Sequence, residues 1–139
     1  MIRFKSIPED IHSKIEALVD FFSKDPNIIF AYLFGGLVKG KRNPLSDVDL
    51  ALYVKDRQDF DYLAVFGEIS SILGTDEIDL IILNNAPLSL TGRILQNRKV
   101  LLDKVPFLRH HYESLILREF YDFSIKEREI VKRRYGIGG

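Results

Sequence analysis

Helical and strand-like segments alternate along the whole of this chain. Segments 28–34 and 77–83 are short and mostly apolar, segment 47–54 alternates apolar and polar residues, and the stretches around them repeat apolar residues at helical spacing. The order is helix, strand, loop, strand, helix, strand, helix, strand, helix. This order predicts one mixed α/β (α+β) unit, in which a small β-sheet is flanked by helices.

A single domain fits the length of 139 residues. We expect its core over about residues 10–104 and a C-terminal helical extension over about residues 106–135. Between residues 107 and 135 there is no glycine or proline, which favours one long helix or two short ones.

The composition excludes several classes of protein. Twenty basic and twenty acidic residues give a net charge of zero, so a broad basic surface for nucleic acid is not expected. No apolar run approaches the ~20 residues of a membrane-spanning helix. The absence of cysteine excludes thiol chemistry and favours a cytoplasmic protein, in which a metal site would have to use carboxylates or histidines.

A glycine pair and two aspartates form the motif with chemical meaning. The apolar strand 28–34 ends at Gly35 and Gly36, and ten residues separate this pair from Asp47. Glycines at a strand end let backbone N–H groups approach a phosphate closely. Alternation along 47–54 places Asp47 and Asp49 on one face, with Cα atoms roughly 6.5 to 7 Å apart.

Asp79 adds a third carboxylate from the next strand. If segment 77–83 lies beside segment 47–54, at a spacing of about 4.8 Å, Asp79 joins Asp47 and Asp49. Neighbouring carboxylates repel one another, and hard divalent cations relieve that repulsion. The arrangement suits Mg²⁺ or Mn²⁺, whose pairs serve phosphoryl and nucleotidyl transfer.

These motifs resemble those of the minimal nucleotidyltransferases of the DNA polymerase β superfamily. The matching residues lie at 34–40, 46–50 and 78–80, within a region of resemblance that spans 30–83. The chain is similar to the MNT (MntA-like) antitoxin group, partners of HEPN-domain toxins. The resemblance implies a polymerase β-like fold and transfer of AMP from ATP to a tyrosine of the toxin, with Mg²⁺ or Mn²⁺.

The resemblance also assigns roles to individual residues. The implied catalytic and metal-binding residues are Asp47, Asp49 and Asp79. The implied nucleotide-binding residues are Gly35, Gly36, Lys39 and Ser46.

Two other functions remain open at this point. The antitoxin group usually has serine where this chain has Gly36, so the first alternative is a catalytically weak antitoxin that masks its toxin by direct contact. The second is a nucleotidyltransferase for a small-molecule or RNA acceptor. Its difficulty is size, because one small core leaves no second domain to hold such an acceptor.

The C-terminal helix predicts a surface for a partner. If unbroken, it would be about 40 Å long at 1.5 Å per residue, which is longer than so small a sheet can cover. Tyr121, Phe123 and Ile130 should therefore lie beyond the core. Exposed apolar groups of this kind mark interaction sites, so we expect this region to bind the toxin or a second copy of the chain.

Overall fold

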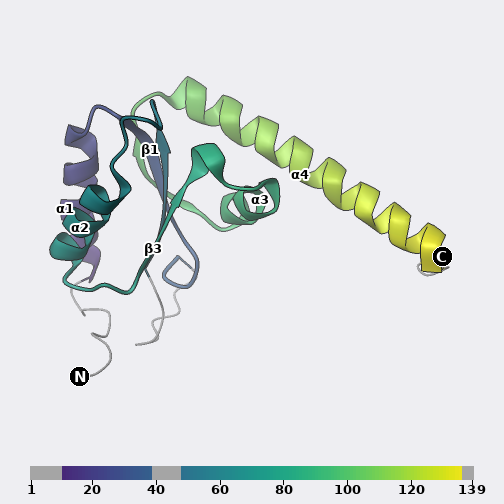
Figure 1. The fold of residues 1–139 in the computed structure, drawn as a ribbon, viewed down its shortest axis with the longest axis horizontal. Helices are drawn as coiled ribbons and strands as arrows, with labels where there is room; N and C mark the ends of the chain where they lie inside the picture. The colour runs from purple at the N-terminus through teal and green to yellow at the C-terminus, as the bar shows by residue number, and fades with distance from the viewer. Residues whose placement is uncertain (1–10, 39–47, 136–139) are drawn as a thin grey trace.

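The computed structural model describes residues 11–38 and 48–135 and has the expected order of elements (Figure 1). The strands are β1 (Ile28–Phe34), β2 (Val48–Val54), β3 (Ile78–Ile82) and β4 (Lys99–Asp103). The helices are α1 (Ile11–Lys24), α2 (Tyr62–Leu73), the short 3₁₀ helix η1 (Leu83–Asn85), α3 (Leu88–Gln96) and α4 (Pro106–Tyr135). The expected start of the core, at about residue 10, lies outside the described residues.

The four strands form one mixed sheet in the order β3-β2-β1-β4. β1 lies in the centre and pairs antiparallel with both β2 and β4, whereas β2 and β3 are parallel. Parallel neighbours need a crossover connection, and α2 supplies it. This sheet and its helices confirm the predicted mixed α/β class.

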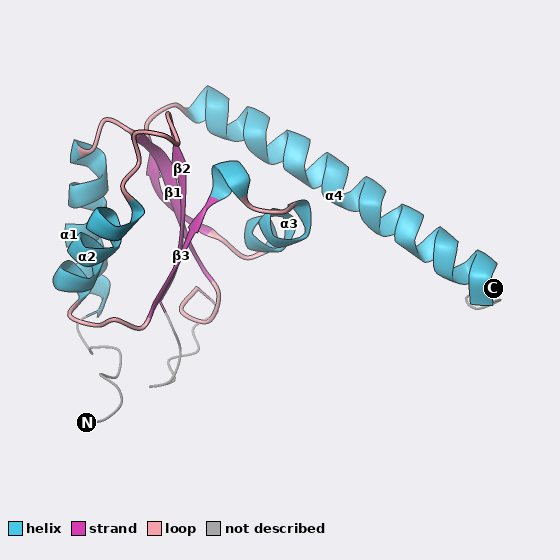
Figure 2. Cartoon of the chain, in the orientation of Figure 1, coloured by secondary structure: helices cyan, strands magenta, loops and turns pink. Residues whose placement is uncertain are grey.

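Helices cover both faces of the sheet (Figure 2). α1 and α2 lie on one face, and α3 and the start of α4 lie on the other. The side chains of β2 alternate between these layers, as predicted: Val48, Leu50 and Leu52 belong to the apolar cluster under α1 and α2. Ala51 and Tyr53 belong to the cluster under α3 and α4. By the same alternation, Asp49 points to the α3 and α4 face.

α4 is one continuous helix of 30 residues. Its first half packs on α3 and on the apolar side chains of β1 and β2, and its second half continues past the rest of the molecule (Figure 1). Among the described residues, no helix combines the length and apolar character that a membrane crossing requires.

Candidate active site

Asp49 and Asp79 lie side by side at one end of the sheet. They are register partners on the parallel strands β2 and β3, so their side chains leave the same face. Asp49 is half-buried, whereas Asp79 is exposed on the edge strand. This is the adjacency that the alternation of the two segments predicted, and it leaves Asp79 within reach of a molecule outside the domain.

Gly35 lies directly against the Asp49 carboxylate. Phe34, the last residue of β1, is the register partner of Asp49. Gly35 follows with a φ of +77°, and a Cβ at this position would stand only 2.9 Å from Cγ of Asp49. Only glycine combines this left-handed backbone with so close an approach. The structure therefore requires glycine at position 35, the first glycine of the motif.

The structure describes four of the seven residues predicted for the site. Gly35, Gly36, Asp49 and Asp79 belong to this end of the sheet, with Gly36 in the turn at 35–38. Lys39, Ser46 and Asp47 lie outside the described residues. Within residues 11–38 and 48–135, no three His, Asp or Glu side chains gather as a metal site. The two adjacent carboxylates nevertheless have the oxygen ligands that Mg²⁺ prefers, and the assigned roles stay predictions.

Tyr62 shows how far the charge of Asp79 extends. Its hydroxyl donates a hydrogen bond of 2.9 Å to the carbonyl oxygen of Leu80, the residue after Asp79. Burial, and secondly the negative charge of Asp79, raise the pKa of Tyr62. The Asp79 carboxylate is thus close enough to Tyr62, the first residue of α2, to disfavour ionisation of its hydroxyl.

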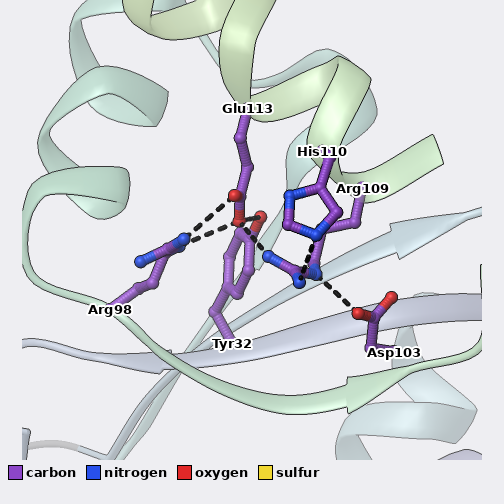
Figure 3. Close-up of polar contacts among 6 residues, drawn as sticks. All are labelled: Tyr32, Arg98, Asp103, Arg109, His110 and Glu113. Carbon is purple, nitrogen blue, oxygen red and sulfur yellow. Dashed lines mark hydrogen bonds and ion pairs between the residues drawn. The ribbon is translucent and has the colours of Figure 1, made fainter. Parts of the chain in front are cut away.

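A second group of polar side chains, the Glu113 cluster, fastens α4 to the sheet (Figure 3). It consists of Tyr32, Arg98, Asp103, Arg109 and Glu113. The Tyr32 hydroxyl donates to Oε2 of Glu113 at 2.6 Å, and Arg98 binds both carboxylate oxygens at 2.9 Å. Arg109 bridges from Oε2 of Glu113 (3.0 Å) to Oδ2 of Asp103 (2.8 Å). One carboxylate of α4 thus holds together β1, β4 and the turn after α3.

The cluster keeps Glu113 ionised although its residue is only 7% exposed. Burial acts to raise its pKa, but hydrogen bonds from Arg98, Tyr32 and Arg109 outweigh burial and lower the pKa to about 2. Burial and the Glu113 carboxylate raise the pKa of Tyr32. The cluster therefore holds the buried Glu113 charge with hydrogen bonds to both of its carboxylate oxygens, which makes it a structural element of the fold.

We predict that Glu113→Gln lowers the free energy of unfolding by about 3 kcal/mol, because it leaves two guanidinium groups without their buried carboxylate. The pKa of Glu113 falls from 4.5 to about 2 on folding. Its contribution, on the order of 3 kcal/mol, is therefore complete above pH ~4.5 and is lost as the pH falls toward 2. Urea unfolding at pH 7 and pH 3 measures both effects.

The matched control is Glu127→Gln, which removes a carboxylate from the exposed second half of α4. This control should change the stability by less than about 0.5 kcal/mol at either pH. Equal stability of the Glu113 and Glu127 variants would contradict the assigned role of the cluster.

A pocket of about 340 Å³ opens beside Gly35, between the end of β1 and α3. We call it the α3 pocket, and its lining residues are Phe34, Gly35, Leu90, Arg93, Ile94, Gln96 and Asn97. The sequence interpretation missed Arg93, Gln96 and Asn97. Polar residues near a helix end are common, and no spacing in the sequence relates α3 to the glycine motif.

The family model for "Polymerase beta, Nucleotidyltransferase" matches residues 16–106. No curated protein matches the chain at a significant level.

Solved structures share the fold at low sequence identity. A mutant of the MntA–HpeT toxin–antitoxin superposes with a TM-score of 0.71 at 18% identity, covering 86% of this chain and 96% of the other. A tri-AMPylated Shewanella oneidensis HEPN toxin in complex with MNT antitoxin gives 0.66 at 17% identity, over 88% and 96% of the chains. A toxin–antitoxin structure with AMP-PNP gives 0.61 at 20% identity, over 87% and 92%.

Proposed function

The chain belongs to the polymerase beta nucleotidyltransferase family, and we propose that it is an antitoxin that transfers AMP from ATP to a tyrosine of a HEPN-domain toxin. The observation that carries this proposal is the pairing of Asp49 with Asp79, with Gly35 against the Asp49 carboxylate. The solved relatives support the choice of partner and acceptor, because they include toxin–antitoxin complexes, one of them tri-AMPylated.

The residues of this chain fit a divalent cation. We assign Mg²⁺ or Mn²⁺ to the carboxylates of Asp47, Asp49 and Asp79, of which the structure brings the last two together. When bound, the cation supplies positive charge that steadies the phosphate oxygens during transfer. Without it, the adjacent carboxylates would repel both each other and the polyphosphate.

The transfer itself is an in-line displacement at the α-phosphorus of ATP. The oxygen of the acceptor tyrosine forms a bond to the α-phosphorus while the bond from that phosphorus to the bridging oxygen breaks, and pyrophosphate leaves with that electron pair. Asp79 accepts the proton of the tyrosine hydroxyl. Its exposed place on the edge strand suits this role, since the acceptor belongs to a second protein.

Asp49 and the glycine turn have a different task in this proposal. Asp49 is half-buried and its carboxylate lies directly against Gly35, so this packing would limit its freedom before the nucleotide binds. Gly35 and Gly36 bring backbone N–H groups toward the polyphosphate without steric hindrance from a Cβ. Lys39 and Ser46 are proposed as further contacts to the nucleotide from the segment 39–47.

Masking of the toxin by contact alone is the second candidate function. It is favoured by the second half of α4, which carries exposed apolar side chains independently of the acidic pair. Gly36 in place of the usual serine points the same way, because the side-chain hydroxyl is missing.

Two functions, nucleotidyl transfer and masking, are distinguished by incubating the chain with its HEPN partner, Mg²⁺ and ATP labelled at the α-phosphate. Nucleotidyl transfer places the label on the partner, and ATP labelled at the γ-phosphate gives none, because pyrophosphate leaves. A stable complex that inhibits the toxin without acquiring label would instead establish masking.

A further inference from the structure

The α3 pocket adjoins the acidic pair on the side away from β3. Its wall begins with Phe34 and Gly35, the residues that pair with and touch Asp49. Across the sheet, Asp79, Asp49 and Phe34 stand on the three adjacent strands β3, β2 and β1. The pocket and Asp79 therefore lie on opposite sides of Asp49, and Asp79 is the residue that we propose to accept the proton of the acceptor tyrosine.

The lining of the pocket combines an apolar wall with polar groups at the rim. Phe34, Leu90 and Ile94 supply the apolar part. Gln96 and Asn97 carry amides that both donate and accept hydrogen bonds. Arg93 is exposed, and within the described parts of the chain no ion pair or hydrogen bond occupies its guanidinium, whose planar face can stack on an aromatic ring.

We infer that the α3 pocket receives the base of the nucleotide, an inference that rests on the proposed nucleotidyl transfer. A nucleobase is flat and apolar on its faces, and its edge carries donors and acceptors, which matches this lining. The volume of about 340 Å³ is at the lower end of small-molecule pockets and accommodates one such ring system. The pyrophosphate part of the nucleotide suits the pocket less well, because it has no apolar surface to pack against Phe34, Leu90 and Ile94.

The Glu113 cluster holds this pocket in shape. Arg98 follows Asn97 directly and is fixed by both oxygens of Glu113, with its guanidinium 5.6 Å from the centre of the Tyr32 ring. Tyr32 precedes Phe34 by two residues on the same face of β1. One buried carboxylate thus binds a neighbour of the pocket on each side, Arg98 next to Asn97 and Tyr32 close to Phe34. A preformed pocket loses less entropy on binding.

Binding measurements with two ligands test the inference. We would titrate the full chain and its Arg93→Ala/Gln96→Ala variant with Mg-ATP and with Mg-tripolyphosphate, which lacks the nucleoside. We expect the Kd for ATP to rise at least about tenfold in the variant, in line with the loss of stacking on a base. The Kd for tripolyphosphate should change by less than about twofold, because the Asp49 region is unaltered.

The control variant, Arg118→Ala/Gln58→Ala, removes the same two exposed residue types away from the pocket and should leave both Kd values unchanged. An unchanged ATP Kd in the pocket variant would overturn the inference, and so would equal weakening of both ligands, which would assign the pocket to phosphates. If the unaltered chain bound neither ligand, the proposed function itself would fail. That result differs from either failure of the pocket.

Discussion

Asp79→Asn should lower the rate of AMP transfer by about two orders of magnitude or more and leave the Kd for Mg-ATP nearly unchanged. Asparagine keeps the size and hydrogen-bonding reach of the side chain but cannot accept the proton of the acceptor hydroxyl. Asp49, the register partner of residue 79 on the neighbouring strand, is unaltered in this variant, so the proposed nucleotide site keeps this carboxylate. Single-turnover transfer to the partner and titration with ATP separate the two effects.

Two further variants make this result specific. Asp47→Asn/Asp49→Asn should lose both ATP binding and transfer, because it removes two of the three carboxylates that we propose to bind the metal. Asp59→Asn, which alters an exposed aspartate in the loop before α2, should change neither. If Asp79→Asn transferred AMP at the unaltered rate, the third carboxylate would have no part in the chemistry.

The part of the site that could be predicted depends on local periodicity. The two-residue period of a strand determines that Asp49 shares a face with Ala51 and Tyr53, and the same rule applies to Asp79 on β3. Parallel pairing of β2 and β3 then makes the two aspartates neighbours. Gly35 was predictable as a strand end, although its contact with Asp49 depends on the register of β1 and β2.

The Glu113 cluster could not be predicted in this way. Tyr32 and Glu113 are 81 residues apart, and their contact depends on how α4 crosses the sheet. Glu113 follows Tyr112 in a helix whose apolar residues spread around its circumference, so no clear polar face assigns the carboxylate to the interior. The one sequence signal is Arg109, four residues before Glu113 on the same helix, a spacing that favours an ion pair between the two side chains.

α4 changes from a packed helix to a projecting one near Phe120. Tyr112, Ile116 and Leu117 pack against the cluster under α3 and α4. Phe120 lies so close to α3 that a Cβ on Gly92 would stand 2.7 Å from its Cε1 atom. Beyond Phe120, no described residue belongs to either apolar cluster. The division agrees with the expectation that the end of this helix lies outside the core.

The projecting part carries the apolar groups expected there. Tyr121, Phe123 and Ile130 are 54%, 46% and 52% exposed. Phe123 and Ile130 are seven residues apart, which is close to two helical turns, so they lie along one side of α4. Apolar groups exposed in this way mark an interaction surface, and under the proposed function this surface binds the toxin.

We expect truncation after Asp122 to leave a folded domain that binds ATP and to abolish the complex with the partner. Of the residues removed, those that the structure describes, 123–135, belong to neither core cluster, so the melting temperature of the isolated chain should change little. In the full chain, Phe123→Ser/Ile130→Ser should weaken partner binding by at least about 100-fold, the effect of losing two interface residues that each contribute about 1.4 kcal/mol or more. Pull-down and titration with the purified partner measure the loss.

Leu63→Ser provides the control for this surface, because Leu63 lies on α2 and is 80% exposed, more than any of the three α4 residues. Its replacement should leave the complex intact if binding depends on α4 and not on exposed apolar area in general. Unchanged affinity of the truncated chain would mean that the partner docks elsewhere. Under the proposed transfer, the partner would then approach beside the exposed Asp79, the residue proposed to accept the proton of the acceptor hydroxyl.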